Sequence, residues 1–235
     1  MNILFYGGCY WGMFEYIGAL RYIKEQNINF DKVYGLSAGS AIALCLLLGI
    51  DVEKLLIFMD KTLCENKNSS MTEIQIIGCR YVLSNNPNAY KLLHKKLYIG
   101  VTDKKGFHFK TSFKSNEDLA SILICGGSIP LLSSWKTEKT QIDGCIAFDN
   151  NLVPENTIVI SPTAPLPLSA IHPPKWLQYI LREHGYNMGR HYIQCKNKNV
   201  NKNTLSDPKI IQICVLIYEN ICVFEPKTES VLCLA

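Results

Sequence analysis

The sequence predicts an α/β domain with a mainly parallel sheet covered by helices on both faces. Short apolar runs alternate along the chain with longer segments of helical periodicity, and two of the runs end in glycine-rich turns. The chain has 235 residues, enough to bury one sizeable core. A sheet of this class carries its functional site at the carboxyl ends of the strands.

The elements follow from the two periodicities. Apolar and β-favouring runs bounded by turn residues predict strands at residues 2–6, 32–36, 97–102, 107–111, 141–142 and 157–160. Apolar positions three and four residues apart predict helices at residues 13–26, 38–48, 52–64, 71–83 and 117–125. Residues 41–48 are apolar on every side, which is typical of a buried central helix.

Residues 35–39 read G-x-S-x-G between a predicted strand and a predicted helix. A strand that turns sharply into a helix with a serine at its apex needs small neighbours, because a Cβ atom there would collide with the turn. Such a turn exposes the serine hydroxyl at the top of the sheet. Ser37 is therefore the candidate nucleophile, with Gly35 and Gly39 as the supporting glycines.

A second glycine-rich loop follows the first predicted strand and contains Gly7, Gly8, Cys9 and Gly12. Backbone N–H groups freed by such a loop can point at developing negative charge, so Gly7, Gly8 and Cys9 are candidate oxyanion donors. Nucleotide binding is the alternative, but Cys9 stands where G-x-G-x-x-G needs its second glycine, and no P-loop lysine pair follows. In isolation the loop is also compatible with a plain tight turn.

Asp143 closes a short predicted strand and is followed at once by Gly144. A serine hydroxyl is a poor nucleophile until a base takes its proton, and a carboxylate within hydrogen-bond reach can do so. The glycine permits a tight turn that directs the carboxylate toward Ser37. Asp-Gly by itself is usually only a turn signal, so the combination carries the interpretation.

In this combination the chain resembles the patatin-like phospholipases. The resemblance rests on the loop at residues 7–12, the elbow at residues 35–39, the Asp143-Gly144 turn, and the segment from residue 97 to the Gly-Ser-Ile-Pro at 127–130. That segment is similar to the family's strand and its Ser-x-x-x-Pro helix end. Residues 172–190 are similar to the C-terminal helices of the adiponutrin and adipose triglyceride lipase branch.

The resemblance implies a patatin-like three-layer fold in a single domain over residues 1–235, with Ser37 on a strand-to-helix nucleophile elbow. We expect the core at about residues 1–195 and a strand-rich extension at about 208–235, because residues 210–234 alternate apolar runs with turn residues. The Asn- and Lys-rich residues 196–206 predict a loop between the two.

The resemblance also implies a lipid acyl hydrolase that cleaves phospholipid or acylglycerol esters through an acyl-enzyme intermediate. Ser37 would be the nucleophile and Asp143 the general base of a Ser-Asp dyad, with Gly12 and Gly144 as supporting motif residues and no cofactor. A histidine triad stays open, because three histidines follow Asp143 in the chain order Ser, Asp, His. We expect these three to be surface or capping residues: His172, His184 and His191.

The chain departs from the family pattern at three positions. Cys9 replaces the loop's third glycine, Trp11 takes its basic position, and Cys145 stands where the family prefers glycine or alanine. Because an oxyanion hole uses main-chain N–H groups, none of these changes removes a catalytic atom. We expect an active enzyme, with a lipid transacylase or a catalytically weak lipid-binding pseudoenzyme as the alternatives.

Charge and hydropathy limit the kinds of partner that the sequence predicts. The net charge of +4 favours anionic surfaces slightly and argues against nucleic acid. The longest apolar run, residues 41–48, is far shorter than the roughly 20 residues of a membrane-spanning helix, and no secretory signal precedes the first strand. We expect a cytoplasmic protein that meets lipid peripherally at a membrane or droplet surface; the sequence leaves its protein partners open.

Ten cysteines occur without C-x-x-C spacing, and no Cys/His cluster has zinc-ligand spacing. The sequence therefore predicts free thiols and no metal. Most of these cysteines lie in apolar or glycine-rich segments, where burial is expected: Cys9, Cys45, Cys79, Cys125, Cys145, Cys214, Cys222 and Cys233.

Overall fold

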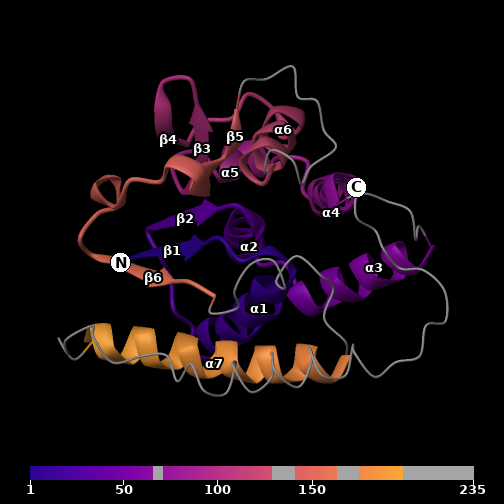
Figure 1. The fold of residues 1–235 in the computed structure, drawn as a ribbon, viewed down its shortest axis with the longest axis vertical. Helices are drawn as coiled ribbons and strands as arrows, with labels where there is room; N and C mark the ends of the chain where they lie inside the picture. The colour runs from indigo at the N-terminus through magenta and orange to yellow at the C-terminus, as the bar shows by residue number, and fades with distance from the viewer. Residues whose placement is uncertain (66–70, 129–140, 163–174, 198–235) are drawn as a thin grey trace.

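The computed structural model describes residues 1–65, 71–128, 141–162 and 175–197 (Figure 1). The predicted extension at 208–235, His172 and nearly all of the predicted loop at 196–206 lie outside these residues. Among the helices that the structure describes, none is long and apolar enough to cross a membrane.

One six-stranded sheet organises the fold. Its main path runs β4-β3-β2-β1-β6, and β5 pairs with β3 beside this path. The three pairs β1–β2, β1–β6 and β2–β3 are parallel, whereas β4 and β5 run antiparallel to β3. The strand bounds are β1 Asn2–Tyr6, β2 Lys32–Leu36, β3 Leu97–Asp103, β4 Gly106–Lys110, β5 Ile142–Asp143 and β6 Thr157–Ile160.

Helices connect β1 to β2, β2 to β3 and β4 to β5, and α7 follows β6. Their bounds are α1 Cys9–Glu25, α2 Ala38–Leu47, α3 Val52–Glu65, α4 Met71–Ser84, α5 Ala89–Leu92, α6 Asn116–Gly126 and α7 Lys175–Asn197, with two 3-10 helices, η1 Gly144–Ala147 and η2 Asn150–Leu152. This confirms the predicted α/β class: a mixed, mostly parallel sheet is flanked by helices, consistent with a three-layer fold.

The predicted strands and helices agree with the observed ones to within one residue at most ends. The exception is α1, which begins at Cys9, four residues before the predicted start at residue 13. Gly8 caps this helix in a left-handed conformation, with φ 118°, so the chain turns immediately and the glycine loop is shorter than expected. The polar stretch around His184 and His191 forms the single long helix α7.

The two faces of the sheet bury different side chains, because successive strand residues point to opposite sides. One face packs against the α-helices in the main core, through residues such as Ile3, Phe5 and Ile99. The other face buries Leu4, Tyr34 and Leu36. Among the described residues, this second face is covered by aromatic side chains and by the segment of η1 and η2, represented by Cys145, Phe148 and Val153.

Helices α1 and α7 lie side by side in direct backbone contact (Figure 1). A Cβ atom on Gly18 would lie 1.9 Å from the Arg182 carbonyl oxygen, and one on Gly185 would lie 1.8 Å from the Glu15 carbonyl oxygen. Glycine is therefore needed on both helices. This contact holds α7 against the helix whose first residues form the glycine loop.

Candidate active site

Ser37 occupies the turn between β2 and α2 with φ 54° and ψ −132°. A positive φ is uncommon for a residue other than glycine and is maintained only where the surroundings enforce it. The Ser37 carbonyl accepts a hydrogen bond from the Ser40 N–H at 2.9 Å, which starts the helix at once. This is the strained strand-to-helix geometry that the G-x-S-x-G pattern predicts.

The two glycines of the elbow are required by backbone packing. A Cβ atom on Gly35 would lie 2.4 Å from the Ser40 Cα atom, and one on Gly39 would lie 2.2 Å from the Phe5 carbonyl oxygen. Real Cβ atoms do not approach other atoms so closely, so α2 can start against β1 only without these side chains. The N-terminus of α2 therefore sits directly on the end of β1.

The glycine loop after β1 is hydrogen-bonded to the elbow. The Gly7 N–H donates to the Leu36 carbonyl at 3.1 Å, and the Gly39 N–H donates to the Gly7 carbonyl at 3.1 Å. The Tyr16 hydroxyl also donates to the Gly7 carbonyl, at 3.2 Å. The loop is thus held beside Ser37 from both sides.

These hydrogen bonds show which of the three predicted oxyanion donors are still available. The Gly7 N–H is already used to hold the loop on the elbow, which leaves the N–H groups of Gly8 and Cys9 as the donors to consider. Cys9 is the first residue of α1, where helix N–H groups lack intrahelical partners and the helix dipole favours negative charge. A Cβ atom on Gly12 would lie 2.6 Å from the Pro162 Cγ atom, so Gly12 serves packing.

Asp143 is buried, with 1% of its surface exposed, at the end of β5. Its Oδ1 atom accepts a hydrogen bond from the Cys145 N–H at 2.8 Å, and its own N–H donates to the Ser128 carbonyl at 3.0 Å. Gly144 is needed next to it, because a Cβ atom there would lie 2.5 Å from the carbonyl carbon of Gly100. The backbone of Asp143 and Gly144 is therefore held against β3 and the segment just after α6, and the Cys145 N–H holds the carboxylate.

Burial raises the pKa of Asp143 above its ordinary value, and hydrogen bonding to Ser37 and to Cys145 opposes this rise. The structure thus brings the serine hydroxyl and the carboxylate together. The buried Oδ2 atom of Asp143 has no hydrogen-bond partner among the described residues.

Sequence patterns did not indicate three residues that shape this site. The Ser128 side chain donates to the Ile124 carbonyl at 2.7 Å and so fixes the carbonyl that holds Asp143. Tyr16 binds the loop from inside α1. Tyr6 lies near Asp143 and Cys145, since burial and then the charges of these two groups raise the pKa of its hydroxyl. Of the three, only Ser128 lies in a motif that the sequence indicates, the Gly-Ser-Ile-Pro at residues 127–130.

The prediction for His184 was wrong. His184 is partly buried between α7 and α1, and its Nδ1 atom lies 3.2 Å from the Oε1 atom of Glu15, which is fully buried. Its polar neighbours along the chain suggested a surface position, but the contact at Gly185 brings this side of α7 against α1. His184 therefore pairs with Glu15 and not with Asp143. The His191 ring lies 6.3 Å from that of Tyr192.

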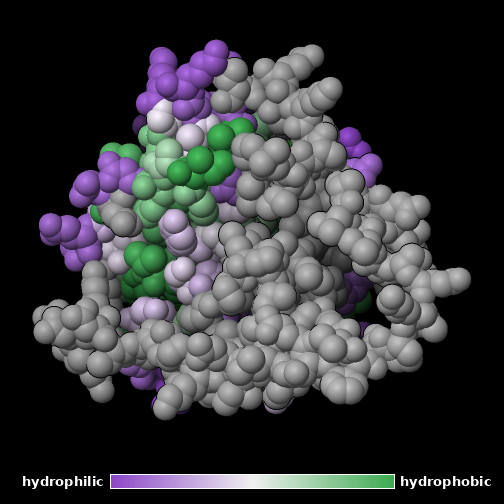
Figure 2. Space-filling model, viewed as in Figure 1, coloured by the Kyte–Doolittle hydropathy of each residue, from purple (hydrophilic) through white to green (hydrophobic). Residues whose placement is uncertain are grey.

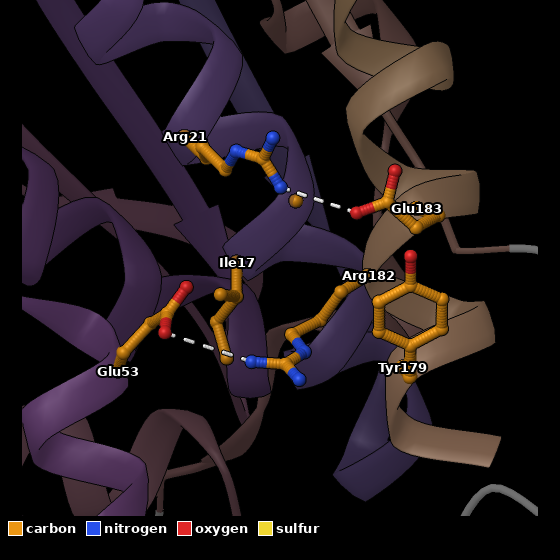
Figure 3. Close-up of a pocket in the computed structure, with 7 residues that line it drawn as sticks. Ile17, Arg21, Glu53, Tyr179, Arg182 and Glu183 are labelled. Carbon is orange, nitrogen blue, oxygen red and sulfur yellow. Dashed lines mark hydrogen bonds and ion pairs between the residues drawn. The ribbon is translucent and has the colours of Figure 1, made fainter. Parts of the chain in front are cut away.

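A pocket of about 230 Å³ lies between α1, α3 and α7 (Figure 3). Two ion pairs bridge its helices: Arg21 Nη1 lies 3.1 Å from Glu183 Oε1, and Arg182 Nη1 lies 3.6 Å from Glu53 Oε2. Because each arginine faces a glutamate of another helix, the charges balance within the pocket. The pocket thus joins three helices, and none of the candidate catalytic residues lines it.

The cysteines whose side chains the structure describes carry free thiols, as predicted. Cys45 and Cys125 are buried, and Cys79 and Cys145 are partly buried. Burial raises the pKa of both the Cys45 and the Cys79 thiol to about 12, so neither is a nucleophile at neutral pH. The Cys145 sulfur lies 3.8 Å from the position that a Cβ atom of Gly7 would take, so it borders the candidate site.

Comparison with known proteins supports the resemblance at the level of the family. No curated protein matches the chain. The family model described as patatin-like phospholipase matches residues 4–95, which include the glycine loop and the Ser37 elbow. The match does not distinguish branches, so the adiponutrin branch stays a prediction. Over residues 4–95, therefore, the chain is similar to the patatin-like phospholipases.

Proposed function

We propose that this protein is a serine acyl hydrolase that cleaves lipid esters with a Ser37–Asp143 dyad. The family match suggests lipid acyl hydrolase activity. The observation that carries the finer proposal is the strained Ser37, at φ 54° and ψ −132°, with the buried carboxylate of Asp143 beside it. Strain that persists at a residue able to act as a nucleophile is typical of a catalytic position.

The first half of the reaction forms an acyl-enzyme. Asp143 takes the proton of the Ser37 hydroxyl, and the Ser37 oxygen attacks the carbonyl carbon of the ester. The N–H groups of Gly8 and Cys9, at the start of α1, stabilise the negative charge on the carbonyl oxygen. When the carbon–oxygen bond of the ester breaks, the departing alcohol takes the proton from Asp143, and the acyl group stays on Ser37.

The second half releases the acid. Asp143 takes a proton from a water molecule, whose oxygen attacks the acyl-serine carbonyl, and the same N–H groups stabilise the second oxyanion. Collapse returns the proton to Ser37 and frees the fatty acid. A raised pKa suits Asp143 for both roles, because a base works best when its pKa approaches the operating pH. The side chains of Cys9 and Trp11 leave this scheme intact, since the oxyanion is stabilised only by the main-chain N–H groups of Gly8 and Cys9.

Labelling with a fluorophosphonate probe tests the dyad directly, because the probe reacts with activated serines. We expect wild-type protein to be labelled, and Ser37→Ala and Asp143→Asn to lose the label. Ser40→Ala is the matched control, since Ser40 lies one turn along the same helix and should not affect labelling. Equal labelling of wild type and Ser37→Ala would refute the mechanism.

Turnover on mixed phospholipid and acylglycerol vesicles then identifies the reaction. Release of free fatty acid supports hydrolysis. Transfer of the acyl group to added monoacylglycerol would show that a lipid alcohol reaches the acyl-enzyme before water, which makes the protein a transacylase. A folded wild type that binds the vesicles but neither labels nor turns over lipid would be a lipid-binding pseudoenzyme.

A further inference from the structure

Apolar side chains are exposed on the face of the sheet that carries η1 and η2. Ile146 is 51% exposed, Leu152 49% and Val159 42%. Figure 2 shows hydrophobic surface gathered on the side of the molecule where β1, β2 and β6 lie in Figure 1. We call this surface the aromatic face and define it by those three residues and by Tyr6, Tyr98, Phe107, Phe109, Phe148 and Val153, which are partly buried on the same side.

The aromatic face is continuous with the candidate active site. The rings of Tyr6 and Phe148 lie 5.1 Å apart, those of Phe148 and Phe107 5.2 Å, and those of Phe107 and Phe109 4.9 Å. Tyr6 is the last residue of β1, directly before the glycine loop, and Ile146 follows Asp143 by three positions. The end of the face that carries Tyr6 and Phe148 therefore borders the segments that hold Ser37 and Asp143.

The chemistry of the face fits a lipid surface. Phenylalanine and aliphatic side chains enter the acyl region of a bilayer, whereas tyrosine and lysine place an apolar body there and a polar tip at the headgroups. Lys32 fits this pattern, because its Nζ atom lies 5.5 Å from the centre of the Tyr98 ring. Large contiguous apolar patches on a protein surface commonly mark sites of interaction with a protein or a membrane.

The charges at the edge of the face favour a zwitterionic surface over an anionic one. Lys32 in β2 and Lys104 and Lys105 in the β3–β4 turn are exposed, and so are Asp149 and Glu155 in the segment after η1. Opposite charges of similar number give little net attraction to anionic lipid. Binding should therefore depend on apolar burial and change little with salt.

We propose that the aromatic face docks on the surface of a zwitterionic phospholipid layer and thereby brings the Ser37–Asp143 pair to its substrate. The inference rests on the proposed lipid hydrolase function. It adds which surface meets the lipid and which interaction drives the contact.

Binding is measured by flotation of Ser37→Ala protein with phosphatidylcholine vesicles, so that no turnover alters the vesicles. In this background we expect Ile146→Glu combined with Leu152→Glu to weaken binding about tenfold or more, because two apolar contacts are replaced by charges. The matched control is Ile57→Glu combined with Leu92→Glu, since Ile57 and Leu92 are 69% and 62% exposed on α3 and α5. The control should bind as its parent does, and raised salt should leave all values nearly unchanged.

Several outcomes would overturn the inference. The face would not be the docking surface if the Ile146 and Leu152 variant floated like its parent, or if the Ile57 and Leu92 variant lost binding instead. Light scattering on the eluting protein shows whether the face joins two copies, which would also refute docking on lipid. Failure of the fluorophosphonate test with face-dependent flotation intact would reject the catalytic proposal and leave the lipid surface supported. Melting temperatures confirm that each variant is folded.

Discussion

Ser37 and its glycines show how few residues determine the geometry of the candidate site. The position of Gly39 is limited by the Phe5 carbonyl, 2.2 Å from where a Cβ atom would stand. Small residues around a serine are common, so the pentapeptide alone is a weak signal. The surrounding strand and helix made it informative, because both could be predicted from local periodicity.

Substituting Gly39 tests this dependence. We expect Gly39→Ala to destabilise the protein by about 3 kcal/mol or more and to abolish fluorophosphonate labelling, because the helix start must move away from β1. Gly49→Ala is the control: Gly49 has a positive φ, at 65°, but nothing lies within 4 Å of its Cβ position, so the substitution should cost about 1 kcal/mol. Urea denaturation measures both. Similar losses for the two variants would contradict the role of close packing at Gly39.

The raised pKa of Asp143 determines how we expect activity and stability to change with pH. Burial raises the pKa of its carboxyl above the ordinary value, and a base must be deprotonated to act. Activity should therefore fall as the pH decreases through the raised pKa, at a higher pH than for an exposed aspartate. The acid limb of the rate profile of wild type measures this. An acid limb at the ordinary pKa of aspartate would contradict the effect of burial.

The same shift has an opposite consequence for stability. A raised pKa in the folded state means that the charged form destabilises the fold, so stability falls as pH rises from the unfolded to the folded pKa. Asp143→Asn keeps the acceptor for the Cys145 N–H and removes the charge. It should be more stable than wild type at neutral pH, with the difference vanishing below the ordinary aspartate pKa. Thermal melts at several pH values would reveal a constant difference if this reasoning fails.

At the scale of elements, the contact between α1 and α7 overrides local helix propensity. Alanine favours a helix over glycine by about 1 kcal/mol, so Gly18→Ala would stabilise an isolated α1. In the protein its Cβ atom would lie 1.9 Å from the Arg182 carbonyl oxygen. We therefore expect Gly18→Ala to destabilise the protein by several kcal/mol. Arg190→Ala, at an exposed position of α7, is the control and should have little effect in thermal denaturation.

Elements that local pattern determines could be predicted, and those that depend on distant contacts could not. Strands β1, β2 and β6 and the turn at Ser37 have clear local signals. The start of α1 could not be predicted, because it depends on the left-handed conformation of Gly8. The burial of His184 could not be predicted either, since it depends on the packing of α7 against α1. The hydrogen bond from the Gly7 N–H to the Leu36 carbonyl, which leaves Gly8 and Cys9 as the candidate oxyanion donors, also forms only when β1 and β2 are adjacent.

At the scale of the whole molecule, segments from the second half of the chain complete the core that the first half begins. Strand β6 pairs with β1 along its full length, and α7 buries Leu177 and Leu181 with the core side chains of α1. The family match ends at residue 95, yet Asp143, β6 and α7 all follow it. The residues that complete the sheet, the candidate base and the helical cover thus come from the second half of the chain.

Two truncations test this organisation and the predicted core at about residues 1–195. A chain ending at residue 162 lacks α7 and exposes the apolar side of α1, so we expect it to aggregate or to unfold without a cooperative transition. A chain ending at residue 197 keeps every described element, and we expect it to unfold cooperatively and to retain the fluorophosphonate label on Ser37. Circular dichroism during heating, with labelling of the same samples, separates the two. Cooperative unfolding of the shorter chain would show that α7 is not part of the core, whereas loss of folding in the longer one would extend the domain into residues 198–235.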